Sequence, residues 1–213
     1  MLHFFRKIKI TYGITVCNEA VELNALLSTI IPFVKKNDEI IVLRDITNAD
    51  IEVANVLKKH EAFLTVVERK LNNNFSEFKN TLITVAKGDY LFQIDADEIP
   101  QQNLLKKLRY ILQKKYRYDC FSVPRINTVE GIKQEHIEKW NWKLNEKGYI
   151  NYPDYQMRIF KLNKGIHWVN KVHEELTGYN RLRQIKADHF DLCLLHHKKI
   201  EKQKKQNEFY DKL

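Results

Sequence analysis

Three acidic residues follow directly on a short apolar run near the middle of the chain. The run is residues 91–94, and Asp95-Ala96-Asp97-Glu98 comes straight after it. Two carboxylates with one residue between them, placed where a strand ends in a loop, can share a hard divalent cation and its water shell. The alternative is that Asp97 or Glu98 only stabilises the N-terminus of a following helix.

The acids belong to a region in which strand-like and helix-like patterns alternate. β-Branched and apolar runs predict strands at residues 9–16, 38–43, 63–67 and 91–94. Stripes of apolar residues predict helices at residues 23–31, 47–59, 74–86 and 100–112. Such alternation builds a parallel sheet, whose ligands bind at the carboxyl ends of the strands. Asp45, after the second strand, is therefore expected to meet Asp95 and Asp97 at one edge.

Short polar signals mark the ends of these helices. Thr47 is predicted to open the second helix through a capping box, and Asn74 is predicted to cap the third, which Gly88 closes. Pro32 stops the first helix. Pro100 is expected where the fourth helix starts.

The pattern changes after about residue 118. Residues 119–125 and 155–161 read as strands, while the segment between them carries Trp140, Trp142, Tyr149 and Tyr152 among charged residues. These aromatic side chains can stack on sugar rings or pack a small subdomain over the sheet. The second part is expected to extend the first domain instead of forming a separate one.

Composition limits the class of protein. The chain has 213 residues, 44% of them hydrophobic, which suffices for one substantial core. Its three cysteines are odd in number and widely spaced, which favours reduced thiols. The sequence has neither a signal-peptide pattern nor a run of ~18 apolar residues, so we expect a soluble, cytoplasmic protein.

The chain is basic, with 36 Lys and Arg against 27 Asp and Glu and a net charge of +9. Such a charge suits nucleic acid, an anionic membrane surface or anionic small substrates. No nucleic-acid-binding pattern is recognisable, so nucleic acid is not an expected partner. The densest basic run, residues 196–205, predicts a solvated terminal helix, with peripheral contact to an anionic membrane as the alternative.

Four segments together resemble glycosyltransferase family 2, which has the GT-A fold. They are ITVCNEAVEL, NFSEFKNTLITVAKGDYLFQIDADE, YPDYQMRIFK and WVNKVHEEL. The resemblance spans residues 10–197 and is closest to a small subgroup that glycosylates lipopolysaccharide core, capsule and other surface glycans. It implies a Rossmann-like single domain with a mostly parallel sheet. Residues 1–117 would then bind the nucleotide sugar, and residues 118–213 would bind the acceptor and supply the catalytic base.

The resemblance also implies a reaction. A sugar would pass with inversion from a nucleotide diphosphate donor, by default UDP-glucose, to a hydroxyl of a glycan or lipid-linked glycan acceptor, assisted by Mn²⁺ or Mg²⁺. The residues that match the family's nucleotide pocket are Thr15, Asn18, Glu19, Asp45, Lys79 and Asn80. The sequence Arg44-Asp45-Ile46 departs from the Asp-Ser that the family often has there.

The same resemblance assigns the metal site. Asp97 is expected to bind the ion, and Asp95 to contact the ribose or the waters of the metal. His196 is expected to complete the metal shell, with His197 and His189 as alternatives. Imidazole is a reasonable ligand for Mn²⁺ beside a carboxylate and diphosphate oxygens.

A catalytic base must accept the proton of the attacking hydroxyl, and a carboxylate within hydrogen-bond reach can do so. Glu174 matches the family's acid before the next helix and is the first candidate. Asp154 is the second, and Glu175 reads better as an acid that caps that helix. Arg158 either binds phosphate or holds an acid in place. His173 is either an orienting group or a core histidine.

Two other classes remain as alternatives. A nucleotidyltransferase also uses paired acids and a metal, but it is expected to have a Gly-rich phosphate loop near the first strand, where VCNEAVEL has no glycine. A non-catalytic basic module that binds surfaces is supported only by the Lys-rich C-terminus.

Overall fold

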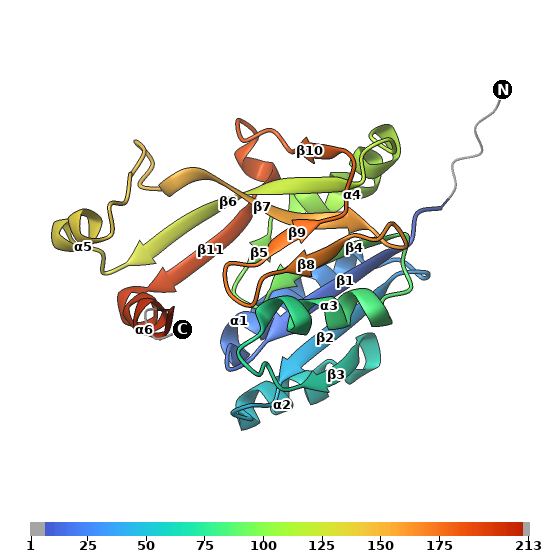
Figure 1. The fold of residues 1–213 in the computed structure, drawn as a ribbon, viewed down its shortest axis with the longest axis horizontal. Coiled ribbons are helices and arrows are strands. Elements are labelled where there is room, and N and C mark those ends of the chain that lie inside the picture. The colour runs from blue at the N-terminus through green and yellow to red at the C-terminus, as the bar shows by residue number, and fades with distance from the viewer. Residues whose placement is uncertain (1–6, 211–213) are drawn as a thin grey trace.

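The computed structural model describes residues 7–210, and the first half of that stretch alternates strands with helices (Figure 1). The strands are β1 (Ile10–Val16), β2 (Glu39–Asp45), β3 (Thr65–Arg69) and β4 (Tyr90–Asp95). The helices are α1 (Ala20–Ile30), α2 (Ile51–Lys59), α3 (Phe75–Val85) and α4 (Gln102–Lys114). Strand β1 pairs in parallel with β2 and β4, and β2 pairs in parallel with β3. The predicted parallel α/β arrangement is confirmed.

The second half adds strands to the same sheet. Its elements are β5 (Ile99–Pro100), β6 (Cys120–Glu130), α5 (Gln134–Lys139), β7 (Ile150–Lys161), β8 (His167–Val169), β9 (Glu175–Thr177), β10 (Leu182–Gln184), β11 (Leu194–Lys199) and α6 (Ile200–Tyr210). Strand β7 lies antiparallel between β4 and β6, and β11 runs parallel to β6. The order in this nine-stranded sheet is β3-β2-β1-β4-β7-β6-β11-β5, with β10 also paired to β6. Strands β8 and β9 form a separate pair.

Helices cover both faces of β1, β2 and β4, which explains why these strands are apolar almost throughout, whereas the edge strand β3 is largely exposed. On one face, α1, α2 and α4 bury leucine and valine side chains against Tyr12 and Ile14 of β1. On the other face, α3 and the β8–β9 pair bury Leu82 and Trp168 against Leu91. Gly13 faces that second layer, where a Cβ atom would lie 2.8 Å from Leu91 Cδ1. Strand β1 therefore lies within a core on each side.

Two predicted helix starts are wrong, and a competing contact explains each. Asp50 caps α2 by accepting from the backbone N–H of Glu52 at 2.7 Å, whereas the Thr47 hydroxyl donates to Asp45. Pro100 does not open α4. It lies in the two-residue strand β5, which pairs antiparallel with β11, a strand that comes much later in the sequence.

The third helix is capped as predicted. The Asn74 side chain accepts from the backbone N–H of Glu77 at 3.1 Å. The helix ends at Val85, before Gly88, which instead lies where a Cβ atom would come within 2.8 Å of the Thr11 backbone nitrogen. The strand predicted at residues 63–67 begins two residues later, because Phe63 ends a short 3₁₀ helix, Glu61–Phe63. Two further 3₁₀ helices are Ile31–Phe33 and Phe190–Leu192.

The second half of the chain contains strands that are longer than the parallel strands of the first half. Strands β6 and β7 have 11 and 12 residues, and with β11 they extend past the ends of β1 and β4 toward α5 and α6 (Figure 1). The predicted strands at residues 119–125 and 155–161 are confirmed as parts of β6 and β7. None of the helices within residues 7–210 has the length and apolar character needed to cross a bilayer.

Candidate functional site

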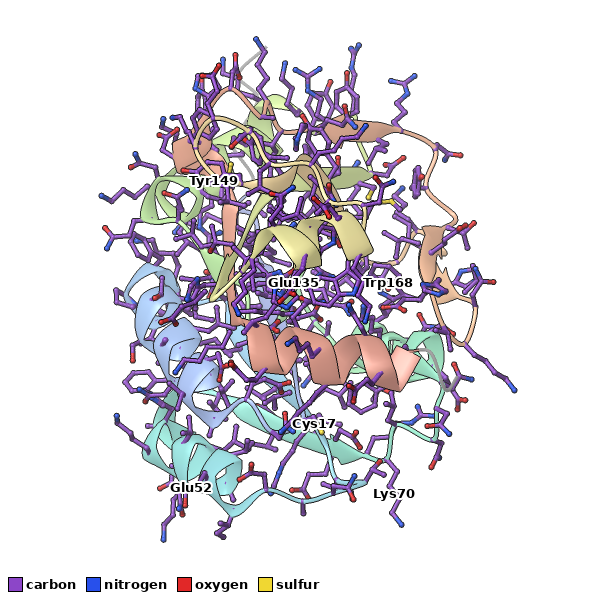
Figure 2. The ribbon with its side chains drawn as sticks, turned by 90° about the vertical axis from the view of Figure 1, so that its left-hand side faces the viewer. Cys17, Glu52, Lys70, Glu135, Tyr149 and Trp168 are labelled. Carbon is purple, nitrogen blue, oxygen red and sulfur yellow. The ribbon has the colours of Figure 1, made fainter. Side chains whose placement is uncertain are left out.

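A cleft of about 930 Å³ lies where β1, β2 and β4 end, walled on its other side by β6, β7 and β11. Most of the predicted site residues line it. They are Thr15, Glu19, Asp45, Lys79, Asp95, Asp97, Asp154, Arg158, Glu174 and His196. The expectation that Asp45, Asp95 and Asp97 meet at one sheet edge is thus confirmed. In Figure 2, α6 crosses this side of the molecule between α5, marked by Glu135, and the loop after β1, marked by Cys17.

Asp95 has a protein partner on each carboxylate oxygen. Parallel pairing sets Thr15 beside it, and the Thr15 hydroxyl donates to Oδ1 at 2.7 Å. Arg158, on β7, donates to Oδ2 at 2.5 Å. Burial opposes ionisation, but the positive charges of Arg158 and Lys79, together with the Thr15 hydrogen bond, outweigh it and hold the pKa of Asp95 well below its ordinary value. Arg158 therefore holds an acid, one of the two roles predicted for it.

A chain of ion pairs continues from Arg158 into the second half. Arg158 also donates to Glu98 at 2.6 Å, and Glu98, whose side chain is 0% exposed, accepts from Arg125 at 2.8 Å. Arg125 in turn donates to Asp154 at 2.8 Å. Glu98 is therefore neither a helix cap nor a metal ligand. It is the buried anion that joins β6 and β7 to the end of β4.

Asp154 is committed to this network. Its Oδ2 accepts from Arg125 and from Asn127 Nδ2, and its Oδ1 accepts from Gln156 at 2.7 Å. Burial opposes the charge, but Arg125 and these donors hold the pKa of Asp154 below its usual range. A carboxylate this well stabilised as an anion is a poor acceptor for a proton from a hydroxyl group.

Asp97 faces the other way, toward β11. Its Oδ2 lies 3.4 Å from His196 Nε2. Asn127 orients the His196 ring. The Asn127 Nδ2 group donates to Asp154, which leaves Asn127 Oδ1 to accept from His196 Nδ1 at 2.7 Å. Burial lowers the pKa of His196, which favours the neutral ring. With the proton on Nδ1, the neutral ring presents the lone pair of Nε2 to the carboxylate.

These two groups fit a divalent cation. Two lone-pair donors that face each other are poorly placed unless a proton or a metal ion lies between them. Their 3.4 Å separation is near the ~3 Å expected of adjacent ligands with ~2.1 Å bonds around an octahedral ion. Among residues 7–210, no three His, Cys, Asp or Glu side chains gather as a metal site. A cation here would take its remaining ligands from phosphate oxygens and water, as Mg²⁺ commonly does.

Glu174 reaches the cleft from an unexpected element. It lies in the loop between β8 and β9, so the helix predicted after it is wrong, and Glu175 is an exposed residue of β9, not a helix cap. The Glu174 carboxylate forms an ion pair with Lys79 of α3. The Lys79 ammonium also lies 4.9 Å from the centroid of the Trp168 ring. This pair fixes Glu174 on the α3 side of the cleft.

The remaining predicted residues mainly shape loops. Asp45 Oδ1 accepts from Thr47 and from the backbone N–H of Leu71, which joins the loops after β2 and β3. Glu19 accepts from the backbone N–H of Cys17 at 2.9 Å and so closes the turn after β1.

Asn18 and Asn80 do not line the cleft. Asn18 lines a second hollow, between α1 and α2. Asn80 exchanges two hydrogen bonds with the backbone of Trp168, at 2.8 and 2.9 Å, and thereby fastens β8 to α3. Its neighbour Lys79 takes the position in the cleft that the pair was expected to share.

Sequence reasoning missed Arg125, Asn127 and Lys198, which all line the cleft. Arg125 interrupts an apolar strand, and a charge within such a strand is the signal that could have found it. Lys198 was assigned to a solvated terminal helix, but it lies in β11 and its side chain is 6% exposed. His196 likewise lies inside β11, not after its end. Membrane contact through the exposed Lys199, Lys204 and Lys205 stays a prediction.

Glu98→Gln tests the buried network. The change leaves the buried Arg158 guanidinium and the partly buried Arg125 guanidinium without their shared anion, so we expect the free energy of unfolding to fall by ~3–5 kcal/mol. Chemical denaturation followed by circular dichroism measures it. Glu68→Gln is the matched control, because Glu68 pairs with Arg44 while its side chain is 50% exposed, and its loss should stay within ~1 kcal/mol. Equal losses in the two variants would contradict a central role for Glu98.

Comparison with known proteins shows a family match over most of the chain. The family model described as Glycosyl transferase family 2 matches residues 11–169. The SPbeta prophage-derived glycosyltransferase SunS of Bacillus subtilis strain 168 is 27% identical over 173 residues, covering 80% of this chain and 35% of SunS. Glycosyltransferase GlyG of Streptococcus pneumoniae serotype 4 is 24% identical over 155 residues, covering 63% of this chain and 51% of GlyG. The chain thus spans between a third and a half of these relatives.

A solved structure shares the fold. The crystal structure of S. aureus TarS 1–349 superposes with a TM-score of 0.59 at 13% identity, covering 89% of this chain and 60% of that one. At that identity the likeness concerns the fold alone. It extends over both the parallel half and the strands that wall the cleft.

Proposed function

This chain belongs to glycosyltransferase family 2, and from that premise we propose that it transfers a sugar from a nucleotide diphosphate donor to a hydroxyl of a glycan acceptor. The observation that carries the proposal is the cleft at the carboxyl ends of β1, β2 and β4, where Asp97 faces His196 beside a salt-bridged Asp95. Ligands of open α/β sheets bind at this position.

The donor that we propose is a UDP-sugar. TarS, which shares the fold, has been crystallised in complex with UDP-GlcNAc and with UDP. Thr15 and Asp45 line the part of the cleft nearest the parallel strands, where the nucleoside would bind. UDP-glucose and UDP-N-acetylglucosamine are the first two donors to compare, and a surface glycan is the proposed class of acceptor.

Asp97 and His196 are the proposed protein ligands for Mn²⁺ or Mg²⁺. Bound there, the ion would neutralise negative charge on the departing nucleoside diphosphate. The residues of the chain provide the rest: Arg158 keeps Asp95 ionised and in place, and Asn127 keeps His196 turned so that Nε2 faces Asp97.

Glu174 is the proposed base, and Asp154 is not, because donors occupy both carboxylate oxygens of Asp154, whereas Lys79 pairs with Oε1 of Glu174. Glu174 would accept the proton of the acceptor hydroxyl while the diphosphate leaves on the opposite side, which gives inversion in a single displacement. On the acceptor side, Trp142 lines the cleft and its ring centroid lies 4.7 Å from that of Trp140. Such an aromatic surface suits the apolar face of a sugar ring.

Asp97→Asn tests the metal site. The amide keeps the size of the side chain but loses the charge that attracts the cation, so the gain in UDP affinity on adding Mn²⁺ should vanish. Calorimetric titration of UDP with and without Mn²⁺ measures this gain. The exposed Asp188 supplies a control, Asp188→Asn, which should behave as the unaltered protein. An Asp97→Asn protein with an unchanged response to Mn²⁺ would remove Asp97 from the site.

Glu174→Gln tests the base. Turnover should fall by ~10²–10⁴-fold, because only the proton-accepting step is lost, while UDP and Mn²⁺ affinities stay nearly intact. Release of UDP from the donor measures turnover, and calorimetry measures the affinities. Glu175→Gln, the exposed neighbour in β9, is the matched control, and Asp154→Asn should lose much less turnover per folded molecule. Near-normal turnover in Glu174→Gln would exclude Glu174 as the base.

A further inference from the structure

Two lysines from the C-terminal part of the described chain converge on Asp97. Lys198, on β11, and Lys202, on α6, each place Nζ 3.6 Å from Asp97 Oδ2. Lys202 also donates a hydrogen bond to Glu22 of α1 at 3.1 Å, which ties α6 to α1. Lys198 lines the cleft itself. The roles of these lysines are not explained by the metal site or by the proposed base.

The distances show that charge, not hydrogen bonding, joins the lysines to Asp97. A separation of 3.6 Å exceeds the 2.7–3.2 Å of an N–H···O hydrogen bond. One carboxylate therefore faces two ammonium groups and an imidazole. An anion that enters the cleft beside Asp97 would therefore meet two ammonium groups whose interaction with Asp97 is electrostatic.

The same arrangement disfavours a lone metal ion. A divalent cation bound to Asp97 and His196 would lie close to both ammonium groups, and like charges at this range repel strongly inside a cleft. A diphosphate relieves the repulsion, because its oxygens can bind the cation on one side and the lysines on the other. Metal and nucleotide should therefore help each other to bind, each raising the affinity of the other by the same factor.

We propose that Lys198 and Lys202 are diphosphate-binding residues that neutralise Asp97 in the ligand-free protein and turn to the phosphate oxygens when the donor enters. This inference rests on the proposed function, because it takes a nucleoside diphosphate as the ligand. Lys202 lies on α6, so donor binding would be linked to the position of that helix over the cleft. Lys199, Lys204 and Lys205, which are exposed, take no part.

Lys198→Met and Lys202→Met test the proposal, since methionine keeps much of the side-chain bulk and removes the charge. Affinities for UDP and for uridine are measured by calorimetry in EDTA. Each variant should lose ~10–100-fold in UDP affinity and less than twofold in uridine affinity, as expected for loss of a charged hydrogen bond to phosphate. Lys199→Met and Lys204→Met are the matched controls and should change neither affinity. Lys202→Arg, which keeps the charge, should retain most of the UDP affinity.

The outcomes separate the inference from the proposed function. Unaltered protein that binds neither UDP nor uridine, in EDTA or with Mn²⁺, would overturn both. Unaltered protein that binds UDP, together with Lys198→Met and Lys202→Met variants that bind it equally well, would overturn the inference alone. Equal losses for UDP and uridine would also overturn it, because they would mean a general disturbance of the pocket. If Lys198→Met does not fold, Lys202, whose side chain is 34% exposed, carries the same comparison. Mn²⁺ without nucleotide should bind the variants more tightly than the unaltered protein.

Discussion

The carboxylates at the end of β4, of which Glu98 is fully buried, depend mainly on cations from the second half of the chain. Asp95, Asp97 and Glu98 lie within four residues, and their positive partners are Arg125, Arg158, Lys198 and Lys202. An unpaired charge in such surroundings costs several kcal/mol. Strand β7 must therefore lie beside β4, with β6 and β11 next in the sheet. The need to pair the charges of the site therefore also determines which strands lie beside β4.

The same pairing prepares the cleft for an anionic ligand. Guanidinium groups help to hold Asp95 and Asp154 as anions, so neither carboxylate has to gain or lose a proton when a ligand binds. Asp97, by contrast, is balanced by side chains from β11 and α6, the proposed ligands of the diphosphate. The family match places the chain among the glycosyltransferases of family 2, and not in the nucleotidyltransferase or basic-module classes. A site with both fixed and exchangeable charges is compatible with that family.

The parts predicted well from the sequence depend on local patterns. Apolar runs located β1, β2 and β4, and parallel pairing then required Asp45, Asp95 and Asp97 to share one edge. The wrong predictions involve partners distant in sequence. Pro100 pairs with Leu194 of β11, and Lys198 turns to an acid about a hundred residues earlier. Local patterns could not reveal Arg125 as the partner of Glu98, because only the register of β6, β7 and β4 brings them together.

Crystals soaked with UDP and Mn²⁺ offer the most direct measurement, since anomalous diffraction locates the manganese. The ion is expected within bonding distance of Asp97 Oδ2 and His196 Nε2, with the diphosphate between it and the ammonium groups of Lys198 and Lys202. Manganese bound elsewhere, or UDP bound outside the cleft at the ends of β1, β2 and β4, would contradict the assignment of this cleft as the donor site.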